Sequence, residues 1–170
     1  MSFRSRLLLA GSNGITRLTI PLEMGRNQKR LMKDVRIFNR EKWQARHWKT
    51  IVSCYNRSAW FIQYSPELSL LFSKEFEFLI DWNLACFEWS KKQLGLSARI
   101  SLTASYRESY NSSDLLDNRN QILPGNYAQM QFVKYHQVFE DRLGFLPNLS
   151  ILDLLFCEGK RASGLIQSSL

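Results

Sequence analysis

The amino-acid sequence predicts an α+β protein, because β-prone runs are few and lie mainly near the N-terminus, whereas helical patterns fill much of the remainder. Two β-prone runs, residues 4–9 and 15–22, flank an Asn13-Gly14 pair, which is typical of a tight hairpin turn. We therefore expect an antiparallel β-hairpin and short strands packed against two main helices. The alternative is an N-terminally truncated α/β domain, which requires more alternation of strands and helices than the sequence has.

Two helical patterns are predicted to carry most of the core. The first spans residues 39–55, with Asn39 as its N-cap. The second spans residues 74–94 and has apolar side chains over a wide arc, so we expect it to be buried on more than one side. The apolar side of the first helix is formed, at steps of four, by Trp43, His47, Ile51 and Tyr55.

Residues 135–159 are predicted to form a short strand, a turn and a short helix in close succession. Ser150 stands three residues before Asp153 at the start of an apolar run, which is the spacing of a capping box with the shorter acid. We expect Ser150 to be the N-cap and Gly159 to end the helix. Since capping explains both Ser150 and Asp153, we assign neither of them a catalytic role.

The segment between these regions is expected to be irregular. Residues 99–102 are predicted to form a strand, and residues 104–130 are predicted to form a long polar loop. Glu108, Asp114 and Asp117 have the chemistry of an acid, a base or a metal ligand, but no His or Cys lies near them at ligand spacing. We therefore expect a solvated loop and no metal site.

Length and composition predict one globular domain over residues 1–170, with 45% hydrophobic residues available for a core. No apolar run reaches the roughly 18 residues that span a bilayer, so the cytoplasm is the expected compartment. Three cysteines, Cys54, Cys86 and Cys157, are widely spaced in apolar surroundings and are expected to be reduced core residues.

Positive charge is concentrated at one end of the chain. Residues 1–49 hold 12 Lys and Arg against three acids, Glu23, Asp34 and Glu41, whereas the whole chain has a net charge of +8. This asymmetry favours an anionic partner there: a nucleotide-linked sugar, RNA or an acidic membrane surface. The other explanation is that the charge serves only solubility.

Few residues offer a direct indication of chemistry. Phosphate loops, dinucleotide fingerprints, serine elbows and paired zinc cysteines are all missing from the sequence, and we expect no cofactor. His47 lies on an apolar helix face, where a structural role competes with that of a general base. Asn83 lies within the second apolar helix and is expected either to tie it to a neighbouring backbone or to line a pocket.

Several motifs resemble the WbqC-like family, bacterial proteins found among O-antigen and other surface-glycan biosynthesis genes. The C-terminal motif runs from Y-x-Q-V-F at residue 135 through G-F-x-x-N-L-S-I-L-D-L-L-F. The resemblance extends over most of the chain, through Trp43, His47-Trp48, Tyr55, Tyr64, Asn83 and residues 117–120. Relatives begin with a tyrosine- and proline-rich segment before an R-N-R-like motif, so the resemblance implies that this chain, with Arg4-Ser5-Arg6 near Met1, is shortened at its N-terminus.

The resemblance implies a transferase of surface-polysaccharide synthesis, with glycine or another acyl group as the transferred unit. Arg4 or Arg6 would hold an anionic or nucleotide-linked donor, and His47 would be the base. Gln137 or Asn148 would orient the acceptor. The site would be completed by three further residues: Trp48, Tyr55 and Asn83.

Two other functions compete with this interpretation. A non-catalytic RNA- or protein-binding module would use the basic N-terminal third, with Trp43, Trp48 and Tyr55 as a stacking surface. That function requires these aromatic residues to be exposed beside the basic residues. An inactive, truncated family member is the other alternative.

Overall fold

An antiparallel β-hairpin opens the structure. The computed structural model describes residues 2–25, 30–110 and 115–168. In it, β1 (Arg6–Gly11) pairs with β2 (Gly14–Thr19). The register runs from the Arg6–Thr19 pair at the open end to the Gly11–Gly14 pair at the turn. The predicted hairpin is therefore formed, with Ser12 and Asn13 as its turn residues and Gly14, at φ of 116°, as the first residue of β2. This sheet and the helices that follow confirm the predicted α+β class.

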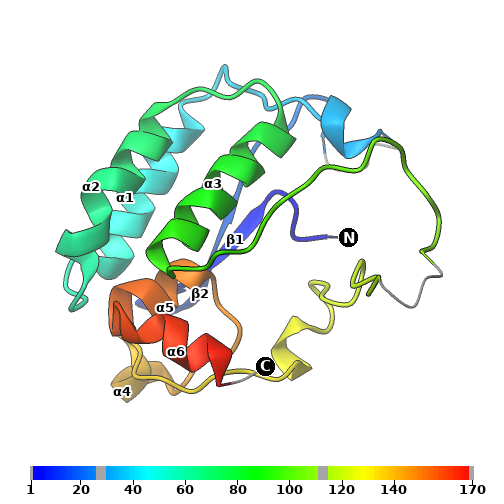
Figure 1. The fold of residues 1–170 in the computed structure, drawn as a ribbon. Coiled ribbons are helices and arrows are strands. Elements are labelled where there is room, and N and C mark those ends of the chain that lie inside the picture. The colour runs from blue at the N-terminus through cyan, green and yellow to red at the C-terminus, as the bar shows by residue number, and fades with distance from the viewer. Residues whose placement is uncertain (1, 26–29, 111–114, 169–170) are drawn as a thin grey trace.

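Three long helices follow the hairpin: α1 (Trp43–Tyr55), α2 (Phe61–Ser73) and α3 (Leu79–Gln93). They lie next to one another, with the hairpin behind them in the view of Figure 1. β1 contacts α1, and α2 contacts both of the other helices. A 3₁₀ turn, η1 (Met32–Asp34), precedes α1. Short strands were expected beside the hairpin. In their place the structure has two isolated β-bridges, Leu22–Ile37 and Arg36–Phe78.

The first helix begins at another residue than predicted. α1 begins at Trp43, and Asn39 does not cap it. Instead, the Asn39 amide donates to the Phe76 carbonyl (2.8 Å) and accepts from the Trp43 indole N–H (3.1 Å). α2 contains Pro66, which lies on the exposed side of the helix, where the lost backbone hydrogen bond costs less.

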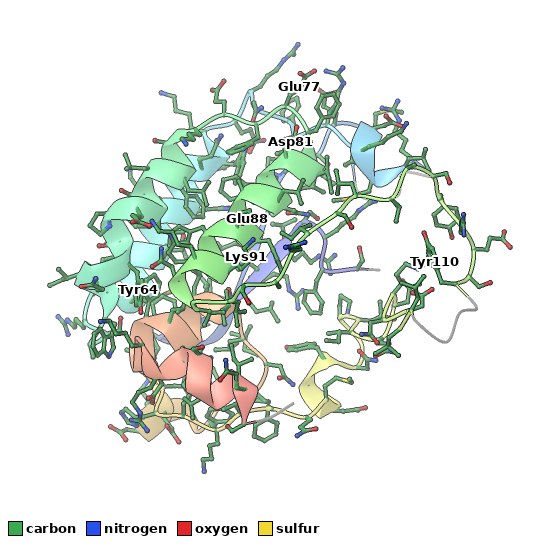
Figure 2. The ribbon with its side chains drawn as sticks, viewed as in Figure 1. Tyr64, Glu77, Asp81, Glu88, Lys91 and Tyr110 are labelled. Carbon is green, nitrogen blue, oxygen red and sulfur yellow. The ribbon has the colours of Figure 1, made fainter. Side chains whose placement is uncertain are left out.

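α3 has one buried side and one polar side. Leu79, Trp82 and Trp89 are buried, whereas Figure 2 shows the charged side chains of Asp81, Glu88 and Lys91 along the same helix. Glu88 and Lys91 form an ion pair at 2.7 Å. The helix begins at Leu79 rather than at Lys74, and Phe87 is 50% exposed, so the predicted burial on more than one side is only partial.

Three shorter helices complete the chain: α4 (Glu140–Leu143), α5 (Ile151–Glu158) and α6 (Arg161–Gln167). Ser150 caps α5 by accepting a hydrogen bond from the Leu152 N–H at 3.3 Å, and the helix ends before Gly159, as predicted. The Asp153 side chain takes no part in the cap, because it is fully buried on the other side of α5. The predicted capping box is therefore wrong at its acidic position.

Two long irregular stretches, residues 96–110 and 115–134, lead away from the helical body after α3 and back to it near α4 (Figure 1). The strands predicted at residues 99–102 and around 135–139 are not formed, because neither segment lies against a strand with which it pairs. The long polar loop is confirmed, with a 3₁₀ turn, η2 (Tyr127–Gln129), inside it. Asp117 is held there by Arg119 (2.6 Å), while Asp114 lies outside the described residues.

The core joins the hairpin to all three long helices and to α5. Its largest fully buried side chains include Trp43, Tyr55 and Phe156, and aromatic contacts connect them across the helices. Trp43 meets Trp82 edge to face, and Phe156 contacts both Tyr55 and Phe61. Within the described part of the chain, no helix combines the length and the apolar character that crossing a membrane requires.

Candidate functional site

A cavity of about 320 Å³ lies between the start of the hairpin, α2, α3 and the start of α5. Four residues proposed from the sequence line it together: Arg4, Arg6, His47 and Asn83. Ligand sites in proteins are commonly cavities of about this size or larger, with apolar walls and a few convergent polar groups. We refer to this cavity as the central pocket.

The apolar wall of the central pocket comes from side chains that the fold buries. They lie on one side each of α2 and α3, and the hairpin and α5 close the cavity from the other direction. Its buried apolar members are Leu18, Ile20, Leu68, Leu71, Phe72, Trp82, Trp89 and Leu152.

The two arginines lie at the more exposed border of the pocket. Arg4 and Arg6 are half-buried, and Phe87, which also lines the pocket, is 50% exposed. Among the described residues, the Arg6 guanidinium has no ion-pair partner. Positive charge therefore borders an apolar interior, an arrangement that suits a ligand with one anionic and one apolar part.

Asn83 fixes the position of the N-terminal segment against α3. Its side-chain amide donates to the Arg4 carbonyl at 3.0 Å. The residue thus combines the two roles considered from the sequence, because it ties α3 to a neighbouring backbone and also lines the central pocket. Through this bond, α3 sets where the Arg4 backbone borders the cavity.

His47 is a neutral imidazole in the pocket wall. Burial is the main cause that lowers its pKa from 6.5 to about 4; a hydrogen bond to the Thr19 backbone opposes this shift, and the charge of Arg46 adds to it. The ring also packs edge to face on Trp43, with centroids 5.1 Å apart. Because one ring nitrogen donates to the Thr19 backbone, the other is an acceptor at neutral pH.

Two polar groups in the pocket lining have no hydrogen-bond partner among the described residues. Ser5 is only 5% exposed, and its hydroxyl bonds to none of them. The Trp89 indole N–H is fully covered and lacks an acceptor. A buried unpaired donor costs about 1–3 kcal/mol, so most folded proteins pair such groups. Of the two, the Trp89 N–H is the one that is both fully covered and unpaired within the described residues, so the Ser5 hydroxyl does not count as a second buried unpaired donor.

Cys86 is the cysteine that lines the pocket, and its thiol is unreactive. Burial raises its pKa to about 12, so almost none of it is thiolate at neutral pH. Burial also raises the pKa of Cys157 to about 12. No group of His, Cys, Asp and Glu suited to a metal ion occurs in the described ranges.

Tyr55 and Gln137 lie away from the central pocket, in a buried hydrogen-bond network around Asp153. The Asp153 carboxylate accepts from the Tyr55 hydroxyl (2.6 Å), the Tyr135 hydroxyl (2.7 Å) and the Gln137 amide (3.0 Å). Gln137 also exchanges two hydrogen bonds with the Leu146 backbone. Burial raises the pKa of Asp153, and the three donors partly offset this effect.

The remaining two predicted residues lie in other surface depressions. Trp48 packs between Phe61 and Phe72 and borders a depression beside α1. The Asn148 amide donates to the Tyr127 and Met130 carbonyls, and the residue lines a cavity next to the central pocket. Arg6 lines both the central pocket and the cavity that Asn148 lines. Asn148 is therefore near the candidate site without lining the central pocket.

Sequence reasoning missed Ser5 and Trp89 as members of the site. In the sequence, Ser5 stands out only because it occupies the position of the Asn in the R-N-R-like motif. Trp89 lies seven residues after Trp82, so the two share one side of α3, and that spacing was the available signal. The absence of partners for their polar groups has no sequence signal at all.

Fold and pocket together define an α+β protein with a largely apolar ligand pocket bordered by arginines. The chain belongs to the WbqC-like protein family, whose model matches residues 1–124. The match includes Arg4, Arg6, His47 and Asn83, and it ends before residues 135–159, where the C-terminal motif lies. Searches of curated proteins and of solved structures gave no match to the chain.

Proposed function

We propose that this protein is a transferase of bacterial surface-polysaccharide biosynthesis, including O-antigen synthesis, and that the central pocket binds its donor. Family membership supports the biosynthetic setting. The observation that carries the proposal is the meeting of Arg4, Arg6, His47 and Asn83, residues far apart in the sequence, around one cavity. The arginines would hold the anionic part of the donor by charge-assisted hydrogen bonds.

The reaction class we propose is acyl transfer, with glycine as one candidate unit. A hydroxyl or amine of the acceptor forms a bond to the acyl carbon, and the bond between that carbon and its carrier breaks. His47 accepts the proton that the acceptor loses and returns it to the leaving group. With a pKa of about 4 the imidazole is a weak base, but a bound anion beside it raises that pKa toward the useful range.

The test is donor binding and transfer in paired variants. Arg6→Ala should weaken binding of anionic donors about tenfold or more, since a charge-assisted contact is lost. Arg17→Ala is the matched control, because Arg17 is an exposed arginine on β2 that does not line the pocket. His47→Gln should lower the transfer rate by about 10²–10⁴ with little change in donor affinity. Equal effects of Arg6→Ala and Arg17→Ala would contradict the donor site.

The RNA-binding alternative loses its proposed stacking surface. Trp43 is 1% exposed and Tyr55 0%, while Trp48 is half-buried between two phenylalanines, so stacking on nucleobases would require the core to open. Lys42, at the N-cap of α1, and Lys49, within α1, remain exposed. Salt-dependent RNA binding abolished by reversing these two charges would favour the alternative.

A further inference from the structure

We propose that the ligand of the central pocket is an amphiphilic anion: a linear apolar chain of about ten carbons that ends in a phosphate or carboxylate group. The proposal rests on the proposed function only in using the same pocket. It adds the chemical class of the ligand, which family membership does not provide.

The apolar part is inferred from the walls. Eight buried apolar side chains surround the cavity, whereas the charged lining residues, Arg4 and Arg6, are half-buried at its border. A water molecule occupies about 30 Å³ in the liquid, so a cavity of about 320 Å³ holds on the order of ten groups of that size. A sugar ring would place hydroxyl groups against walls that offer few partners for them.

The anionic end is inferred from the Arg4-Ser5-Arg6 segment. Both arginines line the pocket, and between them the nearly buried Ser5 hydroxyl lacks a partner among the described residues. Two guanidinium groups and a hydroxyl are suited to the several oxygen atoms of a phosphate or carboxylate. Asn83 holds the Arg4 backbone, so part of this anion-binding segment is in place before the ligand binds.

A second polar contact is inferred deeper in the pocket. The Trp89 indole N–H is covered and has no acceptor in the described structure, although Trp89 lines the cavity. An oxygen within the ligand, such as that of an ester or amide, would give this donor a partner after a small side-chain rotation. A ligand with such an oxygen should therefore bind more tightly than a fully saturated chain of equal length.

The experiment measures the binding of simple probes by the change in intrinsic tryptophan fluorescence, to which Trp82 and Trp89 in the pocket wall contribute, at probe concentrations below micelle formation. Alkyl phosphates of four to ten carbons should bind progressively more tightly, by at most about fourfold per methylene. Decanol should bind at least about tenfold more weakly than decyl phosphate. Comparing the affinities of decanoate and decyl phosphate shows whether the pocket prefers a carboxylate or a phosphate group. Inorganic phosphate, which lacks the apolar chain, should bind weakly.

Two variants locate the binding. Cys86→Phe adds a ring to the pocket wall without touching the arginines, so it should remove the dependence on chain length. Arg6→Ala should weaken decyl phosphate binding about tenfold and leave decanol unchanged, while Arg17→Ala should change neither. Thermal unfolding of each variant verifies that it is folded.

Affinity that does not depend on chain length, or that Cys86→Phe leaves unchanged, would overturn the inference. Equal losses in Arg6→Ala and Arg17→Ala would show adsorption to a basic surface and would overturn it too. These outcomes differ from failure of the proposed function. If decyl phosphate binds as described but no transfer occurs, the ligand class stands and the transferase proposal fails.

Discussion

The two sides of α5 border polar regions of opposite character. On one side, Asp153 is fully buried and its carboxylate accepts three hydrogen bonds from Tyr55, Tyr135 and Gln137. On the other side, Leu152 and its neighbours border the central pocket, where the hydroxyl of Ser5 and the indole of Trp89 lack partners in the described structure.

The difference separates a structural polar cluster from a candidate binding site. In the Asp153 network, each side chain that bonds the carboxylate comes from a distant part of the chain, and the Tyr55 hydroxyl also accepts from the Ala10 N–H at 2.9 Å. Satisfied buried networks fix one packing arrangement. The covered Trp89 N–H that borders the central pocket has no partner in the described structure, so it costs stability without fixing the packing in this way.

Removal of the carboxylate should have the largest effect on stability. Asp153→Ala leaves two tyrosine hydroxyls and the Gln137 amide without their acceptor, so we expect a loss of about 3–5 kcal/mol in the free energy of unfolding. Chemical denaturation measures it. Asp141→Ala, at an exposed acid of α4, is the control and should stay within about 0.5 kcal/mol. A loss below 1 kcal/mol in Asp153→Ala would contradict the structural assignment.

The end of α5 should be the next most sensitive position. Gly159 has φ of 58°, and a Cβ there would lie 2.3 Å from the Trp60 ring. Gly159→Ala should therefore cost about 2–4 kcal/mol, from left-handed backbone strain and from the clash. In a Trp60→Ala background the same substitution should cost about 1–2 kcal/mol. A double-mutant cycle measures the difference, and equal costs in both backgrounds would exclude the clash.

The sequence predicted those parts of the fold that local chemistry determines. The hairpin at Asn13-Gly14, the Ser150 cap and the stop at Gly159 all depend on nearby residues and are confirmed, although the two turn residues are Ser12 and Asn13. The strand at residues 99–102 was wrong, because β-prone residues form a strand only when another strand is available, and that depends on the whole fold.

The candidate site was predictable to a similar extent. Arg4, Arg6, His47 and Asn83 line one cavity, whereas the roles that the resemblance implies for them stay predictions. Tyr55 and Gln137 instead donate hydrogen bonds to Asp153. Tyr55 is 98 positions from Asp153 in the sequence, and Gln137 is 16 positions from it. A residue's spacing reveals the side of the helix on which it lies, but not which distant residue covers it.

Acid should destabilise the protein through His47. Its folded pKa of about 4 is below the unfolded value near 6.5, so between these values the unfolded chain binds the extra proton and stability falls as pH falls. After a discount for partial exposure, we expect the parent to lose about 1–2 kcal/mol more than His47→Gln between pH 7 and pH 4. The raised pKa of Asp153 acts in the opposite direction in both proteins and cancels in the comparison.

Denaturation curves at several pH values test this expectation. Parallel loss of stability in the parent and in His47→Gln would show that His47 titrates normally and that the pocket wall is open to water around it. Saturating decyl phosphate should reduce the difference between the two proteins, because an anion beside the imidazole raises its pKa toward the unfolded value.

The smallest expected effect concerns the indole of Trp89. It is the difference in stability loss between two variants, each of which replaces one buried tryptophan by phenylalanine. Trp43→Phe removes the hydrogen bond from the Trp43 indole N–H to Asn39 (3.1 Å), whereas Trp89→Phe removes the same ring volume and an N–H that has no acceptor in the described structure. Trp43→Phe should therefore cost about 1 kcal/mol more in the free energy of unfolding than Trp89→Phe.

Both tryptophans are at least nine-tenths buried, so the loss of apolar contact is similar and the hydrogen bond is the main difference between the variants. Urea denaturation of both, in the absence of any ligand, measures it. Equal costs would mean that water already satisfies the Trp89 N–H, and the argument for a ligand oxygen near Trp89 would then fail. With the expected difference, Trp89→Phe should also abolish the preference for a probe with an ester oxygen over a saturated alkyl phosphate of equal length, because the N–H that distinguishes them is gone.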